Sequence, residues 1–280
     1  MSIPLRDIKE YPPHEILYYR IFVSIIMIWA IILIFRRKAL KHDLLVFEAL
    51  SKRKRIKFLL LATISAVLIT GNWFTYIYAV NSVSLKSAAF AYLVCPLLTA
   101  FCGVIFLKEK LTKAKIFAIF LALVSIMLLA TGSLHDVVWS ITIASFYATY
   151  IIIMKLIKNV DKFNLLGLHL IISGLIMLPY YVINSNPLPI NGIFWSHIFL
   201  IAILFTIIPL FLNSYALLGM PSSALGILIY INPIVAFSVA FLYFKDKIDV
   251  HQIFAYLLLL FSIIIFNTSF FKPLFIKKHK

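Results

Sequence analysis

The sequence predicts an all-α integral membrane protein built from two inverted repeats of five helices, with the first helix missing from these 280 residues. Hydrophobic residues make up 63% of the chain, charged residues 13%, and the mean hydropathy is +1.04. A soluble domain with this composition would expose too many apolar side chains to water, so the composition predicts a membrane protein. The chain also repeats itself, since SLKSAAFAYLVCPLLTAFCGVIFLKEK (84–110) aligns without a gap with PSSALGILIYINPIVAFSVAFLYFKDK (221–247), 137 positions later. Self-similarity at a fixed offset is typical of a duplicated architecture.

Apolar runs of about 20 residues, the length that crosses a bilayer, predict nine spans. In chain order they cover residues 15–35, 58–80, 86–107, 114–131, 137–154, 163–184, 194–217, 222–244 and 252–270. We expect helices, because the strands of a membrane barrel would alternate polar and apolar residues and these runs do not. Residues 1–14 are polar and contain prolines, so they do not form a signal peptide.

The distribution of basic residues predicts the orientation of the spans. Loop 36–57 holds nine Lys and Arg residues, and placing it in the cytoplasm puts 20 basic residues inside and five outside. The positive-inside rule then predicts a multi-pass protein of the cell membrane with a cytoplasmic carboxyl terminus, the basic tail 271–280. The net charge of +16 therefore reflects cytoplasmic loops rather than nucleic-acid binding. Apolar residues recur at helical spacing within this loop, which is typical either of an amphipathic surface segment or of a plain charged loop.

The two copies of the repeat run in opposite directions. Span 86–107 runs from outside to inside in this orientation, and its copy 222–244 runs from inside to outside. Inversion requires an odd number of spans per repeat. A second correspondence, at an offset of 149, relates 163–184 to 15–35.

These correspondences divide the chain into a first repeat of four spans, 1–131, and a second of five spans, 137–270. We expect the partner of span 137–154 to precede residue 1. Its absence would mean that the start of the gene is set too late or that the chain is truncated.

Transporters with inverted repeats bind solute near the bilayer midplane, often at interrupted helices. Pro96 and Pro233 occupy equivalent positions in the two repeats and are the predicted hinges, with a simple packing kink as the alternative. Alternating access would then come from the two halves rocking about these prolines.

Polar, charged and aromatic side chains within or bordering the spans are candidates for solute binding, because burying polar groups in a bilayer is costly. The candidates are Arg20, Asn72, Trp73, Tyr76, Asn81, Lys86, Asn213, Tyr230 and Asn232. The amides serve equally well to join neighbouring helices. Arg20 either snorkels to the outer surface or binds an anionic group. Its counterpart at the offset of 149, His169, either packs between helices or acts as a titratable gate.

Other chemistry finds little support in the sequence. Cys95 and Cys102 lie seven helical residues apart, about 10 Å, which is too far for a disulfide. No pair of carboxylates and no metal-ligand motif is present in the sequence, so we expect no metal, no cofactor and no enzymatic activity. The expected partners are a small solute and the lipid bilayer, and a homodimer is left open. The alternative function is a membrane enzyme or assembly partner that transports nothing.

Several motifs carry a family resemblance. GNWFTYIYAVN (71–81) is similar to the NWxxYxWAVN signature of RarD-type permeases, in the EamA branch of the drug/metabolite transporter superfamily. YLVCPL (92–97) and FLKEKL (106–111) resemble that family's YFxNPL and FLxERL. LGILIYINP (225–233) resembles its LGFLQYIxP, and EILYYR (15–20) its EILAHR.

The resemblance implies ten helices in two inverted EamA repeats with both termini cytoplasmic, so that the missing element is the first helix. It also implies a permease for a drug or metabolite, a small polar or amphipathic solute. Arg20 and Lys86 would favour an anionic group on that solute. Cys95 stands where the family has Asn, and His169 where relatives tend to have an acidic residue.

Overall fold

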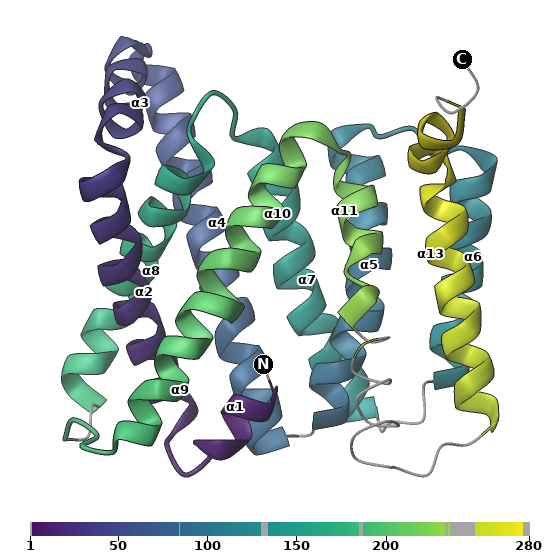
Figure 1. Ribbon diagram of the computed structural model, residues 1–280, viewed down its shortest axis with the longest axis horizontal. Helices are drawn as coiled ribbons and strands as arrows, with labels where there is room; N and C mark the ends of the chain where they lie inside the picture. The colour runs from purple at the N-terminus through teal and green to yellow at the C-terminus, as the bar shows by residue number, and fades with distance from the viewer. Residues whose placement is uncertain are drawn as a thin grey trace. The chain divides into compact units, whose positions relative to one another are not determined.

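The computed structural model describes residues 2–83, 85–129, 134–184, 187–232, 235 and 250–276, and its regular structure there is helical throughout (Figure 1). The helices are α1 (Ser2–Asp7), α2 (Pro13–Phe35), α3 (Arg37–Ala49), α4 (Lys52–Tyr78), α5 (Leu85–Leu107), α6 (Lys113–Leu129), α7 (Leu134–Leu156), α8 (Lys162–Asn184), α9 (Gly192–Ala202), α10 (Ile208–Gly219), α11 (Ser222–Leu228) and α13 (Val250–Ile276). Two π-helical turns, η1 (Ala79–Val83) and η2 (Ile203–Ile207), extend α4 and join α9 to α10. The predicted all-α fold is confirmed.

The helices follow the predicted spans closely, apart from the span 222–244, about half of which lies outside the described residues. Within the described ranges, five helical segments are long and apolar enough to cross a membrane. They are Pro13–Phe35, Lys52–Ser82, Val137–Leu156, Lys162–Asn184 and Gly192–Gly219. The total of nine spans stays a prediction.

The chain forms two compact units, and each takes helices from both halves of the sequence. Unit 1 comprises Met1–Ser84 and Thr149–Gly219, and unit 2 comprises Leu85–Ala148 and Met220–Lys280. The compact units of the fold are therefore not contiguous stretches of chain.

In unit 1, α2 packs against α8 and α9, and α4 packs against α8. Two glycines of α8 bring it close to α2. A Cβ on Gly174 would lie 2.7 Å from Ile25 Cδ1, and one on Gly167 would lie 2.9 Å from Ile32 Cδ1. Because the later residue of α8 meets the earlier residue of α2, these two helices are antiparallel.

An aromatic cluster lies where α2 begins and α8 ends. Tyr18 and Tyr19 make edge-to-face contacts with Tyr181, and Tyr19 also meets Phe194 and Trp195. Such clusters are typical of the membrane–water boundary, where the amphipathic rings of Tyr and Trp are enriched.

In unit 2, α5 packs against α11 and α6 packs against α13. Ser125 of α6 donates a hydrogen bond to the carbonyl of Ala255 in α13, and Ser262 of α13 donates one to the carbonyl of Ala118 in α6, both at 2.8 Å. The order of these residues shows that α6 and α13 are antiparallel. Around them lies an apolar core made of Leu93, Ala118, Ala122, Ile126, Ala224, Ile227, Tyr230, Leu259, Ile263 and Phe266.

Candidate solute-binding site

Arg20 is the most deeply buried cation among the described side chains, with 1% of its surface exposed. Its Nε donates to Thr206 Oγ1 at 2.7 Å, and its Nη2 donates to the carbonyl of Phe205 at 3.3 Å. Both acceptors belong to η2. Pro209 follows four residues after Phe205 and has no N–H to donate to that carbonyl, which leaves it available to the guanidinium.

The guanidinium of Arg20 also lies over the indole of Trp73, with Cζ 4.6 Å from the ring centroid. Trp73 is itself 5% exposed, so this cation–π contact is made away from water, where it is strongest. The expectation that Arg20 snorkels to the outer surface is therefore wrong. The side chain of Arg20 instead points into unit 1, where a hydroxyl, a backbone carbonyl and an indole ring contact its guanidinium.

His169, the counterpart of Arg20 in the second repeat, makes a buried contact from α8. Its Nε2 lies 2.7 Å from Ser65 Oγ on α4, and its ring meets the ring of Tyr150 edge-on at 6.1 Å between centroids. His169 is 1% exposed, and its Nδ1 has no hydrogen-bond partner among the described residues. One turn farther along α8, Ser173 accepts a 2.7 Å hydrogen bond from Thr70 of α4. A buried row of polar contacts thus joins α4 to α8.

The remaining candidates of unit 1 lie on α4, η1 and α10. Asn72 is half-buried, and Tyr76, one turn later, is 8% exposed. Asn81 lies in η1, and its Nδ2 is buried without a hydrogen-bond partner in the described part of the chain. Asn213 is half-buried on α10. Unit 1 therefore contains Arg20, Trp73 and His169 as well as these four residues.

The other candidates belong to unit 2. Pro96 lies inside α5, and Tyr230 lies just beyond α11, where it is fully buried in the apolar core. Asn232 is exposed. The side chain of Lys86 and the whole of Pro233 lie outside the described residues.

A cluster that sequence reasoning missed joins α11 to the loop between α5 and α6. Lys108 adopts a left-handed conformation (φ 54°), which ends α5 and turns the chain toward α11. The carboxylate of Glu109 then accepts hydrogen bonds from Ser222 N, Ser222 Oγ and Ser223 N at 2.8, 2.7 and 3.1 Å. Burial alone would raise the pKa of Glu109, but the hydrogen bonds from Ser223 and Ser222 outweigh it and lower that pKa.

Thr206 was missed as well, because a lone hydroxyl in an apolar span is common and carries no signal of its partner. The KEK motif at 108–110 was noted only as part of the repeated segment and of the family motif FLKEKL. A carboxylate two residues past the end of a span, facing a Ser-Ser pair at the start of another helix, was the signal available for Glu109.

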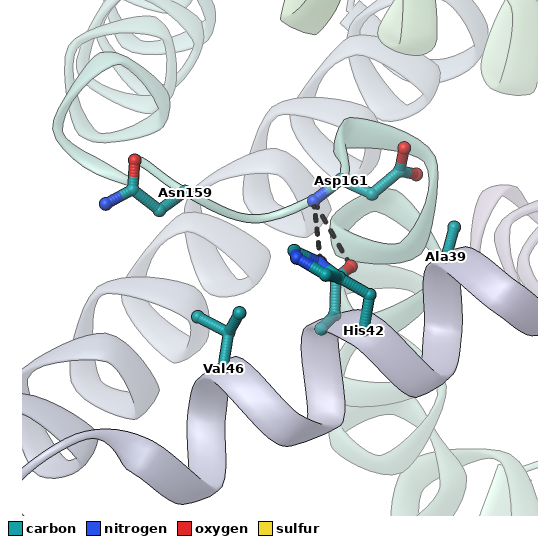
Figure 2. Close-up of a pocket in the computed structure, with 6 residues that line it drawn as sticks. Ala39, His42, Val46, Asn159 and Asp161 are labelled. Atoms are coloured by element: carbon teal, nitrogen blue, oxygen red, sulfur yellow. Dashed lines mark hydrogen bonds and ion pairs between the residues drawn. The ribbon is translucent and has the colours of Figure 1, made fainter.

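A pocket of about 550 Å³ lies elsewhere in unit 1, between α3 and the loop before α8. Figure 2 shows His42 on α3 beneath this loop, with Asn159 and Asp161 above it. None of the residues predicted to bind solute lines this pocket. Among the described residues, no group of three or more His, Cys, Asp or Glu side chains is placed to hold a metal ion.

Comparison with known proteins agrees with this architecture. Protein RarD of Streptomyces exfoliatus is 30% identical over 243 residues, covering 83% of this chain and 72% of the relative. The uncharacterized transporter YojE of Bacillus subtilis (strain 168) is 27% identical over 267 residues, covering 94% and 87%. A solved crystal structure has a TM-score of 0.71 at 14% sequence identity and covers 92% of this chain and 89% of that chain, so it shares the fold.

The sequence pattern of the EamA-like transporter family matches this chain twice, at residues 5–131 and 136–268. These two matches cover nearly all of the described helices. Together with the long apolar helices, they show that the chain is a multi-pass membrane protein that belongs to the EamA-like transporter family.

Proposed function

We propose that this protein is a permease that carries a small polar or amphipathic solute bearing an anionic group, by alternating access between two inverted repeats. The observation that carries the proposal is the burial of the Arg20 guanidinium inside unit 1, beside the interrupted segment α9–η2–α10. A positive charge inside a span attracts an anionic group strongly, because the surrounding dielectric constant is low. Interrupted helices are where transporters of this general design bind solute.

The proposed inversion of the repeats is supported by buried contacts that join each repeat to the other. Arg20 in α2 bonds Thr206 of the second repeat, and its counterpart His169 in α8 bonds Ser65 of the first. Equivalent helices are antiparallel in both units, α2 with α8 and α6 with α13. A twofold axis in the membrane plane would produce both features. In this proposal the carboxyl terminus lies in the cytoplasm.

Within unit 1, the proposed solute contacts are Arg20, Asn72, Trp73, Tyr76, Asn81 and Asn213, and His169 is the proposed titratable gate. Asn81 fits this role best among the amides, since its buried Nδ2 lacks a partner in the described part of the chain. In unit 2, Tyr230 and Asn232 are the proposed contacts and Pro96 the proposed hinge. The roles of Lys86 and Pro233 rest on the sequence alone.

The test is solute flux into proteoliposomes containing the full chain. A panel of small carboxylates, phosphate monoesters, zwitterions and neutral solutes is first screened by thermal stabilisation, and each stabilising solute is then assayed for flux. We expect anionic members to be carried, and Arg20→Lys to reduce their flux about tenfold or more, because Lys cannot reproduce the two-nitrogen contact and the stacking.

The matched control is Arg37→Lys, an exposed arginine on α3, which should leave the flux unchanged. A folded protein that carries no member of the panel would contradict the permease. Flux that does not discriminate between anionic and neutral solutes would contradict the anionic preference. Flux that survives Arg20→Lys would contradict a solute contact through the guanidinium of Arg20.

A further inference from the structure

Helix α3 differs from the other long helices of unit 1. Figure 1 draws it at the top of the picture, beyond the end of α2. None of its 13 residues is buried. The sequence left open whether this segment is an amphipathic helix or a plain loop, and it is a helix.

One face of α3 is fixed to the protein. Asp43 accepts hydrogen bonds from Asp161 N at 3.2 Å and from Asn164 Nδ2 at 2.7 Å. Asp161 in turn caps α8 by accepting from Phe163 N at 3.0 Å, and it pairs with Arg36 at 2.6 Å. These contacts hold α3 in one rotational setting, with Asp43 facing the loop before α8.

The opposite face is basic and apolar. Lys41 and Leu45 lie two residues on either side of Asp43, so they point about 200° away from it around the helix. Lys38 lies on the same side. Leu45 is 66% exposed and its neighbour Leu44 is 53% exposed. Two large leucines interleaved with exposed lysines are typical of a helix that lies in a membrane surface.

The surroundings of α3 continue this surface. Phe35, at the end of α2, is 79% exposed, and Ile56, in the first turns of α4, is 56% exposed. The segment 36–57 carries nine basic residues and two acidic ones, and one of these acids, Asp43, is turned to the protein. Apolar side chains bordered by an excess of positive charge match the boundary between acyl chains and anionic headgroups.

We propose that α3 lies in the headgroup layer and binds anionic lipid headgroups through Lys38 and Lys41, with Leu44 and Leu45 inserted among the acyl chains. The occupant of this face is thus a lipid surface. Long lysine stems allow the ammonium groups to reach phosphates while the leucines stay deeper. With the orientation given in the proposed function, α3 lies in the cytoplasmic leaflet, and this assignment rests on that function. The recognition of anionic lipid does not depend on the orientation.

The experiment places an NBD fluorophore at Leu45→Cys in the full chain, in a Cys95→Ala/Cys102→Ala background. The protein is reconstituted into vesicles of phosphatidylcholine alone and into vesicles with about a third phosphatidylglycerol, which carries a negative charge. Some vesicles also contain a lipid with a nitroxide near its headgroup. We expect a blue-shifted NBD emission that the nitroxide lipid quenches at least about twofold more in the anionic vesicles.

Lys38→Gln/Lys41→Gln should reduce the quenching in anionic vesicles to the level seen in phosphatidylcholine, because each lysine contributes about fivefold to the affinity for such a surface. High salt should do the same by screening the charges. The matched control is Lys110→Gln/Lys113→Gln, which removes two exposed lysines, one from the loop between α5 and α6 and one from the start of α6. This control should leave the quenching of NBD unchanged.

Three outcomes would overturn the proposal. Quenching by aqueous iodide but not by nitroxide lipid would place the face in water, and protection from both would place it against a protein. Equal quenching in the two lipid mixtures would mean insertion without recognition of charge. Solute flux does not enter this readout, so failure here is distinct from failure of the proposed permease.

Discussion

Ser125 and Ser262 make reciprocal hydrogen bonds between α6 and α13, each donating to a carbonyl of the other helix at 2.8 Å. Both hydroxyls are fully buried. The acceptors, Ala255 and Ala118, are separated by the same 137 positions as the two serines. Exchanging the repeats therefore turns one hydrogen bond into the other, which is the relation that a local twofold axis imposes.

Removing either hydroxyl should cost the same stability. We expect Ser125→Ala and Ser262→Ala each to lower the free energy of unfolding by about 0.5–1 kcal/mol, the range for such bonds in membrane proteins. The double variant should show roughly the sum. Unfolding in mixed micelles measures this, with Ser51→Ala as control, since Ser51 is exposed and its side chain makes no cap hydrogen bond. Unequal single effects would argue against the local symmetry.

The crossing of α5 and α11 depends on Gly226. A Cβ on this residue would lie 2.8 Å from Thr99 Cβ, so Gly226→Ala must push the two helices apart. We expect a loss of about 1–3 kcal/mol in stability, as for overpacking of a close contact. The control is Gly219→Ala, where a Cβ meets nothing within 4 Å. A Gly226→Ala protein as stable as the control would show that this crossing is loosely packed.

Glu109 should make the stability of unit 2 depend on pH. Its pKa lies below the ordinary 4.5, so the native state takes up this proton at lower pH than the unfolded chain does. The stabilisation is therefore fully present above pH 4.5 and is lost as the pH falls through the lowered pKa. We expect Glu109→Gln to melt at a lower temperature than the wild type at neutral pH, with the gap closing below pH 4.5.

Thermal unfolding of purified protein across this pH range measures the gap. Glu48→Gln, which alters an exposed carboxylate on α3, is the matched control and should follow the wild type. A gap of constant size at every pH would show that the charge of Glu109 does not contribute.

His169 and Ser65 should be energetically coupled. In a double-mutant cycle with His169→Ala and Ser65→Ala, we expect a coupling of about 0.5–1.5 kcal/mol, because the two side chains share one buried 2.7 Å contact. Stability in mixed micelles is again the measurement. The comparison pair is His169 with Thr142 on α7, whose hydroxyl bonds only its own helix among the contacts described. Coupling no larger than in this pair would show that the His169–Ser65 contact does not stabilise the packing of α4 on α8.

The hydroxyl of Thr206 should stabilise the buried guanidinium of Arg20. We expect Thr206→Val to lower stability by about 1–3 kcal/mol, because it removes an acceptor from a buried charged donor. Thr206→Ser, which keeps the hydroxyl, should recover most of this loss. If Thr206→Ser and Thr206→Val lower the stability equally, the packing of the Thr206 methyl group, rather than its hydroxyl, accounts for the loss.

The sequence by itself determined the helices, their approximate ends and the repeat. These are local properties, since the cost of placing a segment in lipid depends on its own length and composition. The motif 71–81 and its companions were also sufficient to indicate the family, which the comparisons confirmed.

The tertiary structure decided the partners of the buried polar groups. The sequence paired Arg20 with His169 as equivalents, but it could not show that Arg20 turns inward to Thr206. Nor could it show that Glu109 reaches Ser222. The reason is physical: a buried donor is stabilised by whichever acceptor helix packing brings within about 3 Å, and that packing is set by residues far away in the chain.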